Sequence, residues 1–204
     1  MSSTNRGAVR RHNDYYPTPI EVTGLLGDWL SRNELGAGGS VLDPSAGEGA
    51  ILRALEWVGR TLHALEIREE CRASLAFCDV AHIGDALLPR GIRGGVGPSP
   101  RGDDWTGKYG LVACNPPFSL AREFVETYRY VGKVSAFLLR LNFFASQARA
   151  PWWVSDPPAH VLVLPKRPSF TDDGKTDSTD YAWVVWAGRT ARGATRLDWL
   201  TCGR

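Results

Sequence analysis

The 204-residue chain contains no run of about 18 apolar residues, and its first twelve residues are polar and basic without an apolar stretch. The first absence argues against a membrane span and the second against a secretory signal. Neither the four cysteines nor the four histidines cluster, and no CxxC pair occurs. Zinc ligation is therefore not expected, and we predict no metal, free thiols and a reducing, cytoplasmic environment.

A strong charge of either sign is also missing, because the formal net charge is +2 and the isoelectric point lies near 8.4. This balance permits nucleic-acid binding without requiring it. Basic residues gather at the two ends of the chain, where they are Arg6, Arg10, Arg11, Arg189, Arg192, Arg196 and Arg204. Residues 1–13 are predicted to form a basic tail, and both phosphate contacts and simple solvation remain open for these ends.

Strand-like apolar segments alternate with segments of helical periodicity, which is typical of an α/β protein with a parallel sheet. The length, with 43% hydrophobic and 23% charged residues, fits one globular domain. Strands are predicted at 40–43, 61–66, 80–84, 109–114, 134–141, 160–164 and 181–186, and helices over 69–76 and 119–130. Residues 89–107 are predicted to form a mobile loop, and residues 165–180 a polar, exposed segment.

Two further helices are predicted, one after Thr18 and one after Gly49. In the first, Thr18 is expected to cap the helix, Pro19 to occupy its first turn and Glu21 to complete a capping box. Apolar residues then follow helical spacing along the segment.

A glycine-containing turn follows the first predicted strand, in the run Asp43-Pro44-Ser45-Ala46-Gly47-Glu48-Gly49. A strand that leads through such a turn into a helix lets the backbone approach a ligand closely at the carboxyl end of a sheet. Taken alone, the motif is weak, since a tight strand-to-helix turn needs the same glycines.

Two acidic residues strengthen the case for a ligand site at this edge. Glu66 ends the next strand, nineteen residues after Gly47, where a carboxylate can accept hydrogen bonds from a ribose diol. Asp85 closes the third strand and could accept a hydrogen bond from an adenine amine, although such a residue more often caps a loop. The sequence therefore favours a nucleoside-containing cofactor.

The run Asn115-Pro116-Pro117-Phe118 directly follows an apolar strand. An aromatic amine is a poor nucleophile, because its lone pair is delocalised into the ring. Two fixed acceptors on its N–H groups would localise that lone pair, and the Asn115 side-chain oxygen and the Pro116 carbonyl suit this role. The prolines hold the acceptors in place, and Phe118 offers a face on which a base can stack. The alternative is a proline-stiffened turn.

These motifs, preceded by Tyr16-Pro17-Thr18-Pro19, resemble the N6-adenine DNA methyltransferases in their gamma-type order, and most closely the small phage-type members. Arg167-Pro168-Ser169-Phe170 and the run from Thr179 to Trp183 extend the resemblance, which covers roughly residues 14–186. It implies a Rossmann-like class I methyltransferase fold, α/β, with a mostly parallel sheet of about seven strands and a C-terminal antiparallel hairpin. A bacterial or phage-infected cell is the implied setting.

The resemblance implies S-adenosyl-L-methionine as the cofactor. Its binding residues would be Tyr16, Thr18, Asp43, Ser45, Gly47, Gly49, Glu66, Ile67 and Asp85. The catalytic motif, Asn115, Pro116, Pro117 and Phe118, would take the target adenine of DNA.

The chain departs from many relatives because residues 14–204 leave no room for a separate target-recognition domain. Substrate contacts are therefore predicted from the two loops and the termini, through Phe170, Lys166, Arg167, Arg90, Arg93 and Arg101. Three other functions stay open, namely methylation of RNA adenine, methylation of a protein glutamine amide, and non-catalytic binding of nucleic acid. The oligomeric state and the recognition sequence do not follow from the residues.

Overall fold

The computed structural model describes residues 16–36, 38–56, 61–88, 106–170, 176, 178–188 and 194–201. The predicted basic tail lies outside the described residues. So do most of the predicted mobile loop, Cys202, and Arg90, Arg93, Arg101, Arg189, Arg192 and Arg204.

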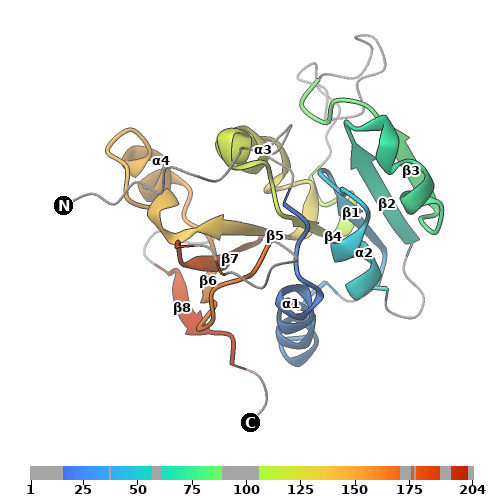
Figure 1. Cartoon of the computed structure of the whole chain (residues 1–204). Coiled ribbons are helices and arrows are strands. Elements are labelled where there is room, and N and C mark those ends of the chain that lie inside the picture. Colours follow the sequence, from blue (N-terminus) through green and yellow to red (C-terminus); the bar gives the residue numbers. More distant parts are fainter. Residues whose placement is uncertain are drawn as a thin grey trace.

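The described strands form a single eight-stranded sheet in the order β3-β2-β1-β4-β5-β7-β6-β8 (Figure 1). The first five in this order pair in parallel, whereas β7 runs antiparallel to both β5 and β6. The strands are β1 (Ser40–Asp43), β2 (Thr61–Glu66), β3 (Val80–Ile83), β4 (Tyr109–Cys114), β5 (Gly132–Arg140), β6 (His160–Val163), β7 (Tyr181–Ala187) and β8 (Arg196–Trp199). The predicted α/β class, parallel sheet and antiparallel C-terminal strands are thus confirmed.

Strand β8 is the main difference from the predicted sheet of about seven strands. It pairs in parallel with β6 at the edge of the sheet, and all four of its residues are exposed. Leu197 and Trp199 do alternate with Arg196 and Asp198, but the alternation covers only four residues, the shortest run that indicates a strand, and the strand was not predicted.

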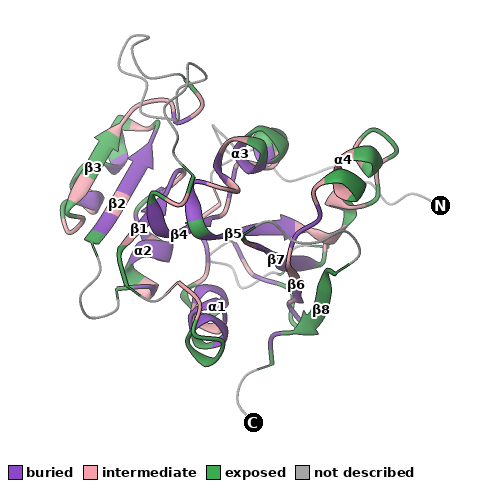
Figure 2. Cartoon of the chain, turned by 180° about the vertical axis from the view of Figure 1, so that it is seen from behind, coloured by how far each residue is buried: buried purple, intermediate pink, exposed green. Residues whose placement is uncertain are grey.

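Helices cover both faces of the sheet, with α1 and α2 on one side and α3 and α4 on the other (Figures 1 and 2). Their bounds are α1 (Ile20–Arg32), α2 (Ala50–Ala54), α3 (Ala121–Tyr128) and α4 (Ala150–Ser155). The predicted helix at 69–76 is instead two 3-10 turns, Glu69–Cys71 and Ala73–Leu75, and further 3-10 turns span Phe118–Leu120 and Leu141–Phe143. None of the helices in the described residues is long and apolar enough to cross a membrane.

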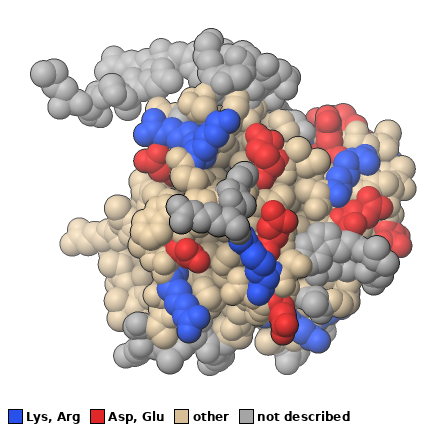
Figure 3. All heavy atoms as spheres, turned by 90° about the horizontal axis from the view of Figure 1, so that it is seen from below, with Lys and Arg blue, Asp and Glu red and all other residues tan. Residues whose placement is uncertain are grey.

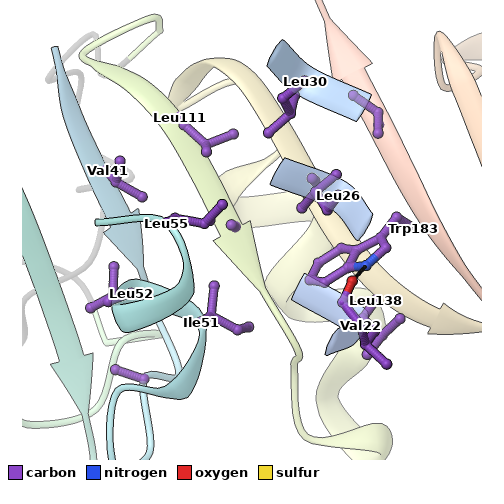
Figure 4. Packing of buried hydrophobic residues seen from close by; sticks show 14 of the residues in the cluster. Val22, Leu26, Leu30, Val41, Ile51, Leu52, Leu55, Leu111, Leu138 and Trp183 are labelled. Atoms are coloured by element: carbon purple, nitrogen blue, oxygen red, sulfur yellow. Dashed lines mark hydrogen bonds between the residues drawn. The ribbon is translucent and has the colours of Figure 1, made fainter. Parts of the chain in front are cut away.

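The apolar core on this face of the sheet holds α1 against the strands (Figure 4). Leu26 and Leu30 of α1 are fully buried, as is Trp183 of β7. The Trp183 indole N–H donates a hydrogen bond of 3.0 Å to the Val22 carbonyl oxygen in the first turn of α1. Because this bond and the apolar contacts fix the N-terminal end of α1, they also place the residues just before it.

The strand order reverses between β1 and β4, since β2 lies on one side of β1 and β4 on the other. In open α/β sheets, ligands bind at the carboxyl ends of the strands beside such a reversal. The glycine-containing turn follows β1, and the Asn115 motif follows β4. The topology therefore brings the two predicted motifs to one edge of the sheet.

Candidate active site

A cavity of about 560 Å³ lies at this edge of the sheet, in the size range of small-molecule sites. Its walls come from the loops that follow β1, β2, β3 and β4 and from the segment before α1. Predicted site residues that line it are Tyr16, Thr18, Asp43, Ser45, Gly47, Glu66, Ile67, Asp85, Asn115 and Pro117. Gly49, Pro116, Phe118 and Phe170 are not among its lining residues.

In the turn after β1, the backbone conformation favours glycine at both Gly47 and Gly49, and close packing also requires it at Gly49. Both Gly47 and Gly49 have positive φ, 57° and 86°, which side-chain-bearing residues rarely adopt. A Cβ atom on Gly49 would also lie 2.7 Å from a ring carbon of Phe77. Gly49 is therefore required for the start of α2, whether or not it touches a ligand.

Asp43 is an almost fully buried carboxyl group at the end of β1, 1% exposed. Its Oδ1 accepts a hydrogen bond of 3.0 Å from the Ser45 amide. Burial raises the pKa of Asp43 from an ordinary 3.8 to about 8, and the negative charge of Glu66 adds to the rise, whereas the Ser45 bond opposes it. Burial therefore favours the protonated form of Asp43 at neutral pH, and a cationic ligand would favour its ionisation.

Asp43→Asn is expected to stabilise the ligand-free protein most at high pH. Because the folded pKa of Asp43 is about 8, wild-type unfolding releases a proton between about pH 4 and 8, and its stability falls as pH rises through that window. Asparagine keeps an acceptor for the Ser45 amide but has no proton to lose. Thermal unfolding of both proteins at pH 5 and 8.5 measures this. Between the two pH values, the Tm of the variant should rise by several degrees relative to that of wild type, which corresponds to roughly a few kcal/mol in the free energy of unfolding. A difference that does not change with pH would contradict this assignment.

Glu66 is 5% exposed and already accepts three hydrogen bonds. Its Oε2 accepts from the Gly47 amide at 2.6 Å, and its Oε1 accepts from both Nε and the backbone amide of Arg68 at 2.9 Å. A carboxylate offers about four acceptor directions, so one remains for a ligand hydroxyl. Taking both hydroxyls of a ribose would require the Arg68 side chain to give up its bond.

Two further predicted residues line the neighbouring wall of the cavity. Ile67 is 55% exposed, although it is a large apolar side chain, and so presents an apolar surface to a ligand. Asp85 accepts a hydrogen bond of 2.8 Å from the Leu87 amide through Oδ1, as a loop-capping residue does. Asp85 also lines the cavity, on the loop after β3.

Asn115 is held by the segment that precedes α1. Its Nδ2 donates to the Tyr16 carbonyl oxygen at 3.1 Å and to Thr18 Oγ1 at 3.0 Å. A backbone carbonyl can only accept, so this contact fixes which end of the amide is nitrogen. The Asn115 Oδ1 atom is consequently turned the other way, and it is buried without a partner among the described residues.

Thr18 does not cap α1, which corrects the predicted capping box. The residue before the helix is Pro19, and no side-chain hydrogen bond caps this end. Thr18 is 7% exposed, and its hydroxyl binds Asn115 instead. The distant partner prevails because the packing of α1 on the sheet brings Asn115 within reach of the same hydroxyl.

Ser45 connects the glycine-containing turn to the catalytic motif. Its Oγ donates to the Asn115 carbonyl oxygen at 3.1 Å and lies 3.1 Å from Cys114 Sγ. This link between the two motifs was not predicted, because Ser45 and Asn115 are 70 positions apart and their spacing does not indicate a contact. It fixes the Asn115 backbone just as Tyr16 and Thr18 fix its side chain.

The described cysteines are all free. Burial raises the pKa of the Cys71, Cys78 and Cys114 thiols, most strongly at Cys114, so none is prepared to act as a thiolate. No group of three or more His, Cys, Asp or Glu side chains that could hold a metal occurs in the described part of the chain.

An aromatic cluster, made of Tyr16, Phe118, Phe170 and Tyr181, lies beside Asn115. Tyr16 stacks on Phe118 with ring centroids 5.2 Å apart, and Phe170 approaches Phe118 edge-on at 6.2 Å. Phe170 is only 6% exposed and Pro168 is also buried, so the predicted exposure of residues 165–180 is wrong at these two positions. The guanidinium of Arg140, a residue that the sequence did not single out, lies 3.9 Å from the Phe118 ring centroid.

The two predicted cationic contacts lie on the surface. Lys166 and Arg167 are exposed, and Arg167 pairs with Asp180 at 2.7 Å. An exposed pair of this kind adds little to stability and leaves the arginine able to exchange partners. On the face shown in Figure 3, Lys and Arg side chains are interspersed with Asp and Glu rather than gathered into one basic patch.

No protein-family model and no curated protein matches the sequence. Among solved structures, a candidate RNA methyltransferase from Pyrococcus horikoshii superimposes with a TM-score of 0.62 at 17% identity, over 90% of this chain and 92% of that one. The methyltransferase subunit of a type I restriction-modification system from Streptococcus thermophilus superimposes with a TM-score of 0.60 at 15% identity, over 87% of this chain and 45% of the subunit. A tRNA (uracil-54, C5)-methyltransferase from Pyrococcus abyssi, solved with S-adenosyl-L-homocysteine, superimposes with a TM-score of 0.52 at 16% identity. The match covers 84% of this chain and 39% of that one.

The chain spans less than half the length of the second and third of these proteins. Identities of 17% or less carry information on the fold and not on the substrate. The three proteins are named as methyltransferases, and their sheets superimpose on the one described above. The chain therefore has a Rossmann-like fold of the class I methyltransferase type.

Proposed function

We propose that this protein transfers a methyl group from S-adenosyl-L-methionine to the N6 amine of adenine in DNA. The observation that carries the proposal is the buried Asn115 Oδ1, which has no partner in the described structure while its own amide nitrogen is anchored twice. A buried acceptor without a partner is unfavourable by about 1–3 kcal/mol, so a substrate donor is its natural complement.

The cavity beside Asn115 suits the proposed cofactor. Asp43 and Glu66 place acidic groups on one wall, and Ile67 places an apolar surface on another. Glu66 would accept from a ribose hydroxyl, Ile67 would pack on an adenine ring, and Asp85 would accept from its amine. When bound, S-adenosyl-L-methionine supplies a methyl group already activated by its sulfonium centre, so the protein need only position the acceptor.

The catalytic motif would prepare the target amine. Asn115 Oδ1 accepts one N–H, and the carbonyl of the buried Pro116 accepts the other, which concentrates the lone pair on nitrogen. The backbone at Pro117 is extended, with φ −51° and ψ 129°, which keeps the motif from coiling back into a helix. Phe118, with Phe170 beside it, offers the surface on which an extruded base would stack.

RNA adenine is the second candidate substrate. The Pyrococcus horikoshii protein, which the chain matches over nearly its full length, is named as a candidate RNA methyltransferase. DNA is favoured by the motif order of the sequence and by the likeness to a restriction-modification subunit. A planar glutamine amide would also fit between the same two acceptors.

Transfer of a labelled methyl group tests the proposal directly. The protein is incubated with labelled S-adenosyl-L-methionine and unmethylated DNA, RNA or a protein extract, and the product is digested and identified. We expect N6-methyladenine from DNA, at single-stranded sites at least as fast as in duplexes, because extrusion of the base is then less costly. Label on RNA or on glutamine alone would reassign the substrate, and label on none of them would remove the proposed activity.

A further inference from the structure

The Phe118 ring, on which a target base would stack, is covered in this structure. The guanidinium carbon of Arg140 lies 3.9 Å from the ring centroid. At that distance it must lie above a face of the ring, because in the ring plane it would overlap the ring's own hydrogens. A stacked base needs about the same spacing, 3.5–4.0 Å between carbon atoms, so Arg140 and a base cannot share that face.

Of the described side chains that contact the Phe118 ring, Arg140 has the longest and most rotatable side chain. Phe170 is 6% exposed and Tyr181 is fully buried, so both are fixed by the core. Tyr16 is held through its backbone, whose carbonyl accepts from Asn115. Arg140 ends β5 on a long, partly exposed side chain, and its Nε donates to the Tyr181 hydroxyl at 3.0 Å.

We propose, on the basis of the proposed function, that Arg140 covers Phe118 until a base enters and is then displaced by it. The Arg140 guanidinium afterwards pairs with a phosphate next to that base. A planar, delocalised cation stacks on an aromatic face much as a base does, and it also binds phosphate in a bidentate manner. Arg140 is thus a positioning residue that exchanges one partner for another as the nucleotide arrives.

The test compares two ligands that should respond in opposite directions to Arg140→Ala. With S-adenosyl-L-homocysteine at saturation, 2-aminopurine riboside, which has no phosphate, should bind several-fold more tightly, since nothing has to leave Phe118. A single-stranded oligonucleotide should bind roughly tenfold more weakly, and the salt slope of its binding should fall by about 0.7, the value for one lost phosphate contact. Fluorescence quenching reports the first affinity, and anisotropy at several salt concentrations reports the second.

Two variants serve as controls. Arg140→Lys keeps the charge and should keep the wild-type salt slope. Arg149→Ala removes a similar arginine, which lies 4.5 Å from the Phe143 ring centroid and donates to the Phe143 carbonyl, and it should change neither affinity. Thermal unfolding of each variant shows whether it folds.

Equal salt slopes and equal riboside affinity for wild type and Arg140→Ala would overturn the inference, even if the wild-type protein methylates DNA. Movement of both affinities in the same direction would do so too. A wild-type protein that methylates no nucleic acid would remove the proposed function and this inference together.

Discussion

Replacing Asn115 with alanine is expected to slow methyl transfer by about a hundredfold or more, while the affinity for S-adenosyl-L-methionine stays within about twofold. The variant removes the buried side-chain acceptor that we propose for the target amine. Loss of a preorganised acceptor costs about 3 kcal/mol in the transition state, and the residues proposed for the cofactor lie mainly elsewhere in the cavity wall. Single-turnover rates and calorimetry, measured on the same preparation, separate the two quantities.

A graded control comes from the anchors of Asn115. Thr18→Val keeps the Oδ1 acceptor and removes one of the two bonds to Nδ2, leaving the Tyr16 carbonyl to fix the amide. Its rate of methyl transfer should lie between those of wild type and Asn115→Ala. If Asn115→Ala turned over at the wild-type rate, the mechanism proposed for this motif would be wrong. If it lost cofactor binding instead, Asn115 would belong to the cofactor site.

Glu66→Ala is expected to weaken binding of S-adenosyl-L-methionine by about 1–3 kcal/mol, roughly 5- to 150-fold in Kd. The variant removes the acceptor proposed for the ribose, and it leaves the Gly47 amide and the Arg68 side chain without their carboxylate partner. Both losses occur in the cavity wall. They should therefore lower the affinity for the cofactor more than they lower the rate of the chemical step. Calorimetric titration with the cofactor measures the effect.

Glu69→Ala is a matched control for Glu66. Glu69 follows the same strand three residues later, but it is exposed and pairs with Arg72 on the surface. Its replacement should leave the Kd unchanged. Unchanged affinity in Glu66→Ala would place the ribose elsewhere, and equal weakening in both variants would point to a general loss of structure. Thermal unfolding of Glu66→Ala, checked beforehand, shows how far the loss of its internal bonds destabilises the fold.

Local patterns were sufficient to predict most of the sheet. Tyr109–Cys114 is buried at all six positions, and its bounds match the predicted strand because the apolar run ends at two prolines. Such runs specify strands through burial and backbone restriction alone, with no need of a distant partner. Strand β8 was not predicted, because its apolar alternation covers only four residues and none of them is buried.

The motifs also predicted which side chains meet at one edge of the sheet. Of the nine proposed cofactor residues, eight line the cavity, and Gly49 is the exception. This follows from chain order, because parallel strands end at the same edge and the reversal of strand order lies between β1 and β4. The roles assigned to these residues remain predictions until the cofactor titrations are made.

The sequence by itself determined the class of fold, and it predicted the place of the site and Asn115 as the acceptor for the target amine, because each depends on short-range order along the chain. Only the tertiary structure decided which polar groups pair. The Thr18 hydroxyl had a local partner in the helix end and a distant one in Asn115, and packing selected the distant one. Arg140 came to lie over Phe118 in the same way. A hydrogen bond or a stacked cation is made by whichever partner folding brings within about 3–4 Å, and sequence spacing does not record that distance.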